Sequence, residues 1–496
     1  MRRFAALLAV PGVLAAQGPA TGAGTDLPPV SREVRAVWVA TVNNMDWPSR
    51  PGLSVETQQR ELLAILDRAA SLKMNTIVFQ VRPEADALYR SDLEPWSRFL
   101  TGEQGKSPGW DPLAFAVTES HKRGLELHAW FNPYRVAFYK SRPRSRGHIS
   151  RQRPDLVLEY AQFLWMDPAL PEVRRLMIRV ITDVVRRYDV DGVHIDDYFY
   201  PYPESRNGRT IPFPDTRTYR AYQRSGGQLS LGDWRRRNVD MLVRDFYGAV
   251  KKEKPWVKVG ISPFGVWRPG YPPTTTAGLD QYNELFADVR KWLHEGWLDY
   301  LAPQLYWPTR PADQSFPVLL EWWVRESVKG RHIWPGLALY KLPISGARRM
   351  RAMEIAEQIQ LTRATPRAEG HIHFNAKVLM DNVDGIADYL ANLYAQPVIQ
   401  PAFPWLDSVP PPRPMARVST QQGAAMLHLE PSDRQHTALW VLRSRVHGDW
   451  RTTVLPGVAR AHILGDDHLA ADLLAVSAVD RAGNVSDAAI LRPDQR

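Results

Sequence analysis

The sequence of 496 residues contains no cysteine, which excludes disulfide bonds, thiolate metal sites, iron–sulfur clusters and a cysteine nucleophile. Beyond the N-terminus it also lacks any apolar run approaching the roughly 18 residues of a membrane-spanning helix, so we expect no transmembrane segment. With 44% hydrophobic and 23% charged residues, the chain is instead typical of a globular protein. Its length predicts one large domain and a smaller one.

The first 20 residues are typical of a cleaved export signal. Arg2 and Arg3 precede an apolar stretch over residues 4–16, and small residues follow it. Gln17 stands where a bacterial lipoprotein signal would place the lipidated cysteine. The sequence therefore predicts an exported protein, periplasmic or extracellular, that carries no lipid anchor.

Basic residues outnumber acidic ones, 63 against 53, and 18 residues are tryptophan. The net charge of +10 favours an acidic partner such as nucleic acid, a membrane surface or an acidic polysaccharide. Nucleic acid is disfavoured, because the chain has an export signal and no basic recognition helix. Tryptophan suits sites that stack against flat ligands, although burial is its commoner use. These features together favour a polysaccharide.

Past residue 31, short apolar segments alternate with stretches of helical periodicity, such as 55–73 and 173–188. The predicted strands are 34–40, 76–82, 125–132, 192–199, 257–264, 300–307, 332–340 and 371–376. Eight strands alternating with helices predict an α/β fold, a (β/α)₈ TIM barrel with insertions. A doubly wound open sheet is the alternative, but no glycine-rich phosphate turn follows the first strand.

The composition changes near residue 397, where prolines cluster up to residue 414. We assign residues 32–395 to the barrel, 396–415 to a proline-rich linker or wrapping segment, and 416–496 to a second domain. The last segment reads as short strands separated by turns, which predicts a small all-β sandwich.

The alternation of side chains along each strand indicates which residues face the barrel interior. In strand 192–199 the apolar Val193 and Ile195 should face the helices, which turns His194, Asp196 and Tyr198 inward. The same rule on four other strands turns inward Gln80, Arg82, Glu84, His128, Trp130, Asn132, Gln304, Tyr306, His371, His373 and Asn375. A merely packed interior would carry Val, Ile and Leu there, so the pattern predicts an active site at the C-terminal strand ends.

Asp196 is the leading candidate for a general acid, because a carboxyl among aromatic side chains has a raised pKa. Asp197 follows it directly. Glycoside hydrolysis usually needs a second carboxylate, for which Glu84 is the best-placed candidate and Asp86 and Asp46 are weaker ones. A substrate-assisted route is the alternative, in which the sugar's N-acetyl group is the nucleophile and Tyr306 and Asn375 orient it.

A metal site is a further alternative, because His128, His194, Asp196 and His373 could converge on zinc in a deacetylase. No compact ligand motif such as HExxH occurs, so we predict no metal and no other cofactor. The histidines instead suit hydrogen bonding to sugar hydroxyls. Trp307, at the end of its strand, suits stacking on a sugar face.

The strand-end motifs, in this order, resemble the glycosyl-hydrolase-like 10 family. The matching stretches are 35–41 (RAVWVAT), 79–83 (FQVRP), 128–135 (HAWFNPYR), 192–201 (GVHIDDYFYP), 260–265 (GISPFG) and 302–307 (APQLYW). The resemblance implies an exported bacterial TIM barrel that hydrolyses glycan, with Asp196 in the site and with cell-division proteins as partners of some members. The C-terminal domain resembles a fibronectin type III module more weakly.

We therefore expect an exported glycoside hydrolase that cleaves N-acetylated bacterial cell-wall glycan, namely peptidoglycan strands. The alternatives are a non-catalytic glycan-binding barrel and a metal-dependent polysaccharide deacetylase. The predicted catalytic residues are Asp196, Asp197 and Glu84. The predicted substrate-binding residues are Gln80, Arg82, His128, Trp130, Asn132, His194, Tyr198, Gln304, Tyr306, Trp307 and Asn375.

Overall fold

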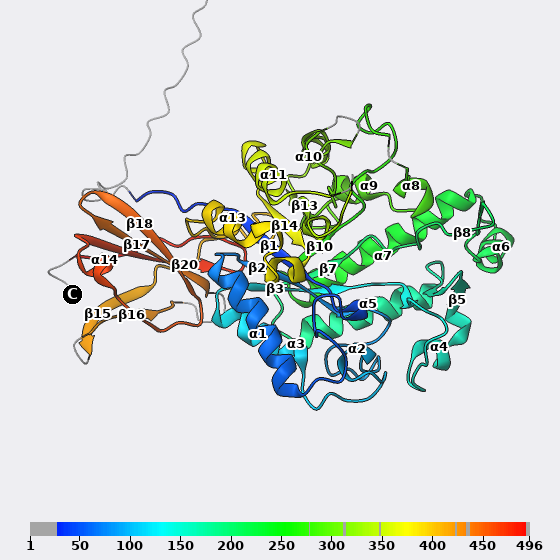
Figure 1. Cartoon of the computed structure of the whole chain (residues 1–496), viewed down its shortest axis with the longest axis horizontal. Helices are drawn as coiled ribbons and strands as arrows, with labels where there is room; N and C mark the ends of the chain where they lie inside the picture. Colours follow the sequence, from blue (N-terminus) through cyan, green and yellow to red (C-terminus); the bar gives the residue numbers. More distant parts are fainter. Residues whose placement is uncertain are drawn as a thin grey trace, which may run out of the picture.

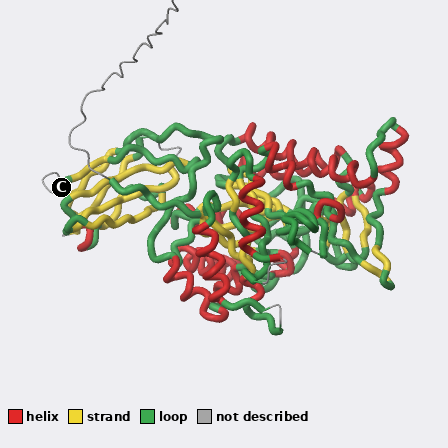
Figure 2. Tube along the Cα trace, turned by 90° about the horizontal axis from the view of Figure 1, so that it is seen from above, coloured by secondary structure: helices red, strands yellow, loops and turns green. Residues whose placement is uncertain are grey.

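The computed structural model describes residues 27–276, 278–310, 314–346, 349–421, 424–432 and 437–492. The predicted export signal at residues 1–20 lies outside this part of the chain. A large α/β body and a smaller all-β body lie side by side (Figure 1), and a second view separates them equally clearly (Figure 2). Within the described ranges, no helix combines the length and apolar character needed to cross a membrane.

The large body is built on a parallel sheet that closes on itself. Its strands are β1 (Val34–Val39), β2 (Thr76–Arg82), β3 (Glu126–Phe131), β7 (Gly192–Ile195), β10 (Lys258–Ile261), β11 (Tyr300–Leu301), β12 (His332–Ile333), β13 (Gly336–Ala338) and β14 (Gly370–Phe374). The hydrogen-bonded order runs β12-β11-β10-β7-β3-β2-β1-β14-β13. Only Trp334 and Pro335 separate β12 from β13, so the two ends of this order are halves of one strand. The predicted eight-stranded barrel is confirmed.

Helices connect successive strands and cover the outside of the barrel (Figure 1). The long ones are α1 (Val55–Ser71), α3 (Pro112–Lys122), α5 (Pro171–Arg187), α7 (Leu231–Glu253), α9 (Val289–Glu295), α10 (Phe316–Glu326), α11 (Ala352–Ala364) and α13 (Ile386–Leu393). Local sequence sets their starts. The side chain of Asp111 accepts a hydrogen bond from the backbone N–H of Ala114, and Pro112 occupies the first turn of α3.

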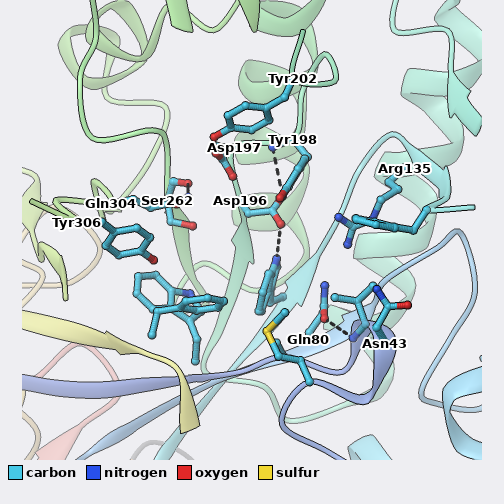
Figure 3. Close-up of a pocket in the computed structure, with 17 residues that line it drawn as sticks. Asn43, Gln80, Arg135, Asp196, Asp197, Tyr198, Tyr202, Ser262, Gln304 and Tyr306 are labelled. Carbon is cyan, nitrogen blue, oxygen red and sulfur yellow. Dashed lines mark hydrogen bonds between the residues drawn. The ribbon is translucent and has the colours of Figure 1, made fainter. Parts of the chain in front are cut away.

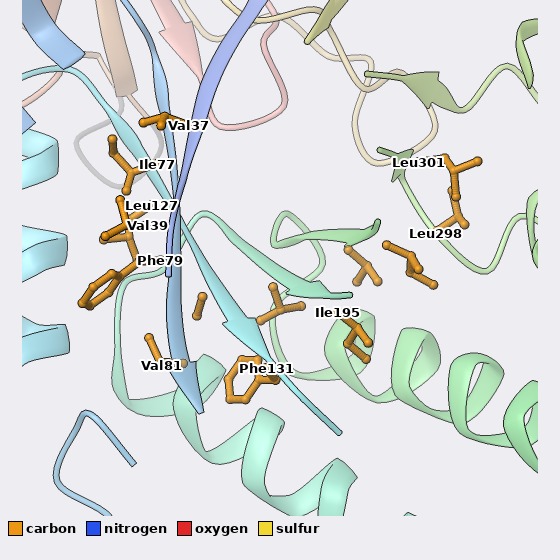
Figure 4. Packing of buried hydrophobic residues seen from close by; sticks show 14 of the residues in the cluster. Val37, Val39, Ile77, Phe79, Val81, Leu127, Phe131, Ile195, Leu298 and Leu301 are labelled. Carbon is orange, nitrogen blue, oxygen red and sulfur yellow. The ribbon is translucent and has the colours of Figure 1, made fainter. Parts of the chain in front are cut away.

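The main core lies between the strands and these helices. Val37, Phe79, Leu127 and Ile195 point away from the barrel axis into this layer (Figure 4), and all four are fully buried. On α5, apolar residues at helical spacing face the same layer. The outward assignments predicted for Val193 and Ile195 agree with this cluster, as do Leu127, Ala129 and Phe131, which alternate with the inward residues predicted on β3. Parity therefore gives the correct facing for β3 and β7.

The parity prediction for β14 is wrong. Ile372 belongs to the interior cluster and Phe374 packs against it, whereas His371 and His373 both contact the hydroxyl of Tyr394, just after α13. The rule assumes that apolar residues face the helices. Here a buried tyrosine hydroxyl hydrogen-bonds Nε2 of each imidazole on the helix side, which leaves the apolar residues to the interior.

Small elements inserted after β3 and β7 stand above the C-terminal strand ends. A three-stranded sheet follows β3, and a two-stranded hairpin and a further helix follow β7. The elements are β4 (Arg135–Ala137), α4 (Ile149–Gln152), β5 (Val157–Tyr160), β6 (Phe163–Met166), β8 (Ser205–Arg206), β9 (Arg209–Thr210) and α6 (Thr216–Arg224). Shorter α-helices elsewhere in the described residues are α2 (Arg98–Thr101), α8 (Gln281–Glu284), α12 (Ala376–Met380) and α14 (Asp466–Leu469).

The smaller body is the predicted two-sheet β-sandwich. Its strands are β15 (Met415–Gln421), β16 (Ala424–Glu430), β17 (Thr437–Val446), β18 (Asp449–Pro456), β19 (Ala461–Ile463), β20 (Leu473–Asp480) and β21 (Ala489–Leu491). One sheet has the order β15-β16-β19 and the other β18-β17-β20-β21. Leu427, Trp440, Leu442 and Val476 are buried in its core. Its likeness to fibronectin type III stays a prediction.

The segment between the two bodies closes the N-terminal end of the barrel. Phe403 is fully buried there, with its ring 4.6 Å from that of His332. The indole N–H of Trp405 donates to Asp299 at 2.9 Å. Arg481 of the sandwich pairs with Asp189 of the barrel at 2.6 Å. The sandwich thus docks at the end of the barrel opposite the C-terminal strand ends.

Candidate active site

A cavity of about 270 Å³ opens at the C-terminal ends of the barrel strands. Figure 3 shows polar side chains converging on it from several strands and from the loops above them. The lining residues are Trp38, Ala40, Val42, Asn43, Met45, Gln80, Trp130, Arg135, Phe138, Asp196, Asp197, Tyr198, Tyr202, Ser262, Gln304, Tyr306 and Phe374. Aromatic walls around a few polar groups are typical of a ligand site.

Asp196 lies at the centre of the cavity (Figure 3). Its Oδ2 accepts hydrogen bonds from the indole N–H of Trp130, at 3.1 Å, and from the amide Nδ2 of Asn132. Burial, reinforced by the charge of Asp197, raises the pKa of Asp196 to about 7. Because Oδ2 already accepts two donors, the acidic proton belongs on Oδ1.

Asp197 lines the same cavity, although strand alternation would send it to the opposite face. The reason is that β7 ends at Ile195, so strand alternation is not continued as far as Asp197. The hydroxyl of Tyr202 donates to Oδ2 of Asp197. Burial raises the pKa of Asp197, against the opposing effect of hydrogen bonds from Tyr202 and Gln304.

A hydrogen-bonded network behind the cavity holds Asp196 in place. Asn132 bonds Asp196 through Nδ2 and accepts at Oδ1 from Gln80, at 2.6 Å, and Arg135, at 2.7 Å. Gln80 in turn accepts at Oε1 from the backbone N–H groups of Thr41 and Val42. Residues from β2, β3 and the loop after β1 thus fix the orientation of one carboxyl group.

Aromatic rings form two walls of the cavity. Tyr306 stacks on Phe374 with ring centroids 6.2 Å apart, and Trp38 meets Phe374 edge-on at 6.1 Å. The guanidinium of Arg135 lies over the ring of Tyr198 at 4.9 Å. Such walls exclude water and offer flat apolar surfaces, which suit the apolar face of a sugar ring.

Seven of the fourteen residues predicted from the sequence line this cavity, namely Gln80, Trp130, Asp196, Asp197, Tyr198, Gln304 and Tyr306. Asn132 lies directly behind them as a positioning residue. Glu84 does not line it. One oxygen of Glu84 accepts from the backbone N–H of Phe138 at 2.6 Å, and the other lies 3.5 Å from Arg98. Glu84 is thereby buried in a separate cluster.

The weaker carboxylate candidates are structural in the same way. Asp86 is fully buried and accepts from the backbone of Glu84 and the side chain of Gln104. Asp46 accepts from the backbone N–H groups of Ala40, at 2.7 Å, and Lys377, at 2.8 Å. Asp46 therefore ties the end of β1 to α12. Neither residue lines the cavity.

Arg82 is likewise outside the cavity lining. The pairing of β2 with β3 shifts register between Gln80 and Arg82, so alternation cannot be extended past Gln80. Arg82 forms a bidentate ion pair with Glu94 and also donates to the backbone carbonyl of Asn132. Its guanidinium thereby holds the loop after β2 to the end of β3.

His128 and His194 lie deeper in the barrel than the cavity. Trp38 Nε1 donates to His194 Nε2 at 3.2 Å, so His194 donates from Nδ1 to the Tyr300 hydroxyl at 3.0 Å. That hydroxyl donates to His128 Nδ1 at 2.8 Å, and His128 Nε2 lies 3.1 Å from Glu126. Both imidazoles are therefore occupied by protein partners.

Trp307 and Asn375 complete the predicted set, and neither lines the cavity. The ring of Trp307 packs edge-on against Phe264 at 5.4 Å. Asn375 directly precedes α12, and its Oδ1 is buried with no hydrogen-bond partner in the described part of the chain.

Several lining residues were not predicted. Trp38, Ala40 and Ser262 lie within predicted strands, and alternation with the outward Val37, Val39 and Ile261 would have found them. The others come mainly from loops, where no periodicity applies. They are Val42, Asn43, Met45, Arg135, Phe138, Tyr202 and Phe374.

The alternative in which the histidines converge on a metal is not what the structure shows. His373 is on the helix side of β14, and His128 and His194 are joined through Tyr300. In the described residues, no three His, Cys, Asp or Glu side chains group in a way that could hold a metal ion.

Comparison with protein families confirms the resemblance of the strand-end motifs. The model of the family described as glycosyl hydrolase-like 10 matches residues 33–351. The chain belongs to this family. The matched span contains every cavity-lining residue except Phe374.

Relatives named as glycosyl hydrolases cover most of the chain. It is 41% identical over 451 residues to glycosyl hydrolase YngK of Bacillus subtilis, a match spanning 87% of this chain and 86% of the relative. It is 36% identical over 381 residues to glycosyl hydrolase DigH of Escherichia coli, spanning 70% and 84% respectively. Among solved structures, the catalytic domain of a β-amylase from Paenibacillus polymyxa superposes with a TM-score of 0.50 at 10% identity. That match covers 74% of this chain and the whole domain, and it supports the barrel fold.

Proposed function

We propose that this protein is an exported glycoside hydrolase that cleaves N-acetylated glycan of the bacterial cell wall, namely peptidoglycan strands. The observation that carries the proposal is the pair Asp196 and Asp197, buried side by side in an aromatic cavity at the catalytic end of a barrel. Membership of a glycosyl hydrolase-like family supports the reaction class. The composition of the first 20 residues supports export.

Asp196 is the general acid in this proposal. With a pKa of about 7, a large share of Asp196 is protonated near neutral pH. The hydrogen bonds from Trp130 and Asn132 occupy Oδ2, which leaves the proton on Oδ1. Transfer of that proton to the glycosidic oxygen lets the bond to the anomeric carbon break with a neutral leaving group.

Asp197 orients the nucleophile, which is the substrate's own 2-acetamido group. The carbonyl oxygen of that group attacks the anomeric carbon as the glycosidic bond breaks, and Asp197 accepts a hydrogen bond from the acetamido N–H. The positive charge that develops on the resulting ring is stabilised by the carboxylate. Water then adds at the anomeric carbon while Asp196, now ionised, takes its proton. This route needs no carboxylate beyond the two in the cavity.

The shape of the cavity favours a substituted sugar over a small polar metabolite. Tyr306, Phe374 and Trp38 offer apolar ring faces, whereas Gln304 and Arg135 supply hydrogen-bond donors near the two carboxylates. A pyranose presents the same combination, an apolar face and polar edges.

The proposal is tested by digesting purified glycan strands, with and without their peptides, in ¹⁸O-labelled water and analysing the products by mass spectrometry. The wild type should release shorter oligosaccharides that carry one ¹⁸O at each new reducing end. The Asp196→Asn variant should release none, while keeping the wild-type melting temperature.

Two outcomes would overturn the proposal. Strand binding by the wild type without new reducing ends would make the protein a non-catalytic glycan-binding barrel. Release of acetate without chain shortening would make it a deacetylase.

A further inference from the structure

A second hollow adjoins the catalytic cavity and is lined by arginines. It has a volume of about 520 Å³, and we call it the arginine groove. Its lining residues are Asn43, Asn44, Pro51, Arg98, Phe99, Gly102, Tyr139 and Arg142. Asn43 lines both hollows, so a ligand that leaves the cavity on this side enters the groove. Figure 3 shows Asn43 at the edge of the cavity near Gln80 and Arg135.

The charge of the groove is uncompensated on the side that faces solvent. No Asp or Glu lines it, and Arg142 has no ion-pair partner among the described residues. Arg98 reaches only the buried Glu84, at 3.5 Å. Nearby Arg144 has its pKa lowered by burial and by the charges of Arg151 and Arg98. The local potential is therefore positive.

Arg142 is held in a fixed orientation with donors to spare. Its Nη1 donates to Asn43 Oδ1 at 3.0 Å, and its guanidinium lies over the ring of Tyr139 at 4.5 Å. A guanidinium has five N–H donors, so a planar fork remains for an anion. Held in this way, it loses little side-chain entropy on binding.

The floor of the groove is equally well ordered. Asn43 and Asn44 both have left-handed backbone conformations, with φ of 54° and 55°. The side-chain amide of Asn44 donates to the carbonyls of Pro48 and Phe99, each at 2.9 Å. The loop after β1 is thereby tied to α2, so the groove exists before any ligand arrives.

We propose that the arginine groove binds a carboxylate carried by the glycan, beside the sugar that occupies the catalytic cavity, and that Arg142 is the residue that recognises it. This inference rests on the proposed glycan hydrolysis and adds to it a subsite and a residue that determines specificity. A guanidinium fork matches a carboxylate through two parallel hydrogen bonds. Arg142 acts on specificity and takes no part in bond cleavage.

The test uses three glycans with the same N-acetylated backbone chemistry. They are peptide-free strands with free lactyl carboxylates, the same strands after carbodiimide coupling to methylamine, and neutral oligomers of N-acetylglucosamine. The wild type should show a kcat/KM about tenfold or more higher on the free carboxylate than on the methylamide. A fourth substrate, strands that keep their peptides, shows whether the groove recognises lactyl carboxylates or peptide carboxylates.

Three variants separate recognition from folding. Arg142→Gln should remove the advantage of the free carboxylate and leave kcat/KM on the neutral oligomer unchanged. Arg142→Lys should restore part of that advantage, because it keeps the charge and loses the fork. Arg146→Gln, which removes an exposed charge from the same loop without lining the groove, should behave as the wild type.

Equal kcat/KM of the wild type on the carboxylate and methylamide strands would overturn this inference and leave the hydrolase proposal intact. An equal loss on acidic and neutral glycans in Arg142→Gln would also overturn it, by making the arginine structural. If the wild type cleaves none of these glycans, the hydrolase proposal fails. In that case the groove is tested by measuring the Kd of the same strands. The methylamide strands should bind about tenfold more weakly than the strands with free carboxylates.

Discussion

The two ends of the barrel interior both contain buried ionisable side chains, and these side chains serve different purposes. At the C-terminal end, Asp196 and Asp197 face a cavity, and neither carboxylate has a cationic partner within salt-bridge distance among the described residues. Deeper in the barrel, towards the N-terminal end, His128 and His194 both hydrogen-bond the hydroxyl of Tyr300, and Phe403 closes the barrel below them. Buried polarity alone therefore does not mark an active site. What distinguishes one is a polar group left free to meet a ligand.

After the complete loss expected for Asp196→Asn, the next largest effect falls on Asp197. Asp197→Asn keeps the size of the side chain but removes the charge that orients the acetamido group, so kcat should fall by about 10²–10⁴-fold. The melting temperature should stay close to that of the wild type, because Tyr202 can still donate to the amide oxygen. Steady-state kinetics on glycan strands and calorimetry check this. A variant with wild-type kcat would remove Asp197 from the mechanism.

The pH profile tests the other aspartate. The pKa of Asp196 is raised to about 7, and the acid must be protonated to act. Hence kcat/KM should be highest below pH 7 and fall about tenfold per pH unit above it. In Asp197→Asn the charge that helps raise the pKa of Asp196 is gone, so the decline of kcat/KM should begin at a lower pH. If kcat/KM of the variant declines at the same pH as that of the wild type, the coupling between the two carboxyls is contradicted.

The N-terminal end should respond in stability and not in activity. Tyr300→Phe removes the hydroxyl shared by His128 and His194 and leaves two buried imidazole nitrogens without partners. The free energy of unfolding should drop by about 1–3 kcal/mol, measured by urea titration. The kcat per folded molecule should stay within about twofold of the wild type. A large loss of kcat with unchanged stability would erase the distinction between the two ends.

The smallest effect is expected at Glu84, which the sequence suggests as the second carboxylate. Glu84→Gln keeps an oxygen to accept from the backbone N–H of Phe138, and the residue does not line the cavity. We expect kcat within about twofold of the wild type. Kinetics on the same strands measure it. A loss as large as that expected for Asp197→Asn would restore Glu84 as a catalytic candidate.

The sequence predicts the barrel well because barrel formation depends on local periodicity. Val193 and Ile195 repeat at strand spacing, and the apolar face of α5 repeats at helical spacing, so both can be read one segment at a time. The same reading fails where a strand is irregular. The register shift beyond Gln80 misplaces Arg82, and the end of β7 at Ile195 hides the role of Asp197. On β14 it fails because the hydroxyl of Tyr394, from another element, hydrogen-bonds His371 and His373 on the helix side of the strand.

By itself, then, the sequence determined the eight-stranded barrel, the all-β C-terminal domain and the facing of Asp196. These follow from alternation and composition, which are properties of neighbouring residues. Only the tertiary structure decided which buried polar groups are already paired and which face open space. His128 and Tyr300 are 172 positions apart, and Asn43 and Arg142 are 99 positions apart. Contacts over such separations depend on how the strands close and how the loops fold over them, and no local pattern records that.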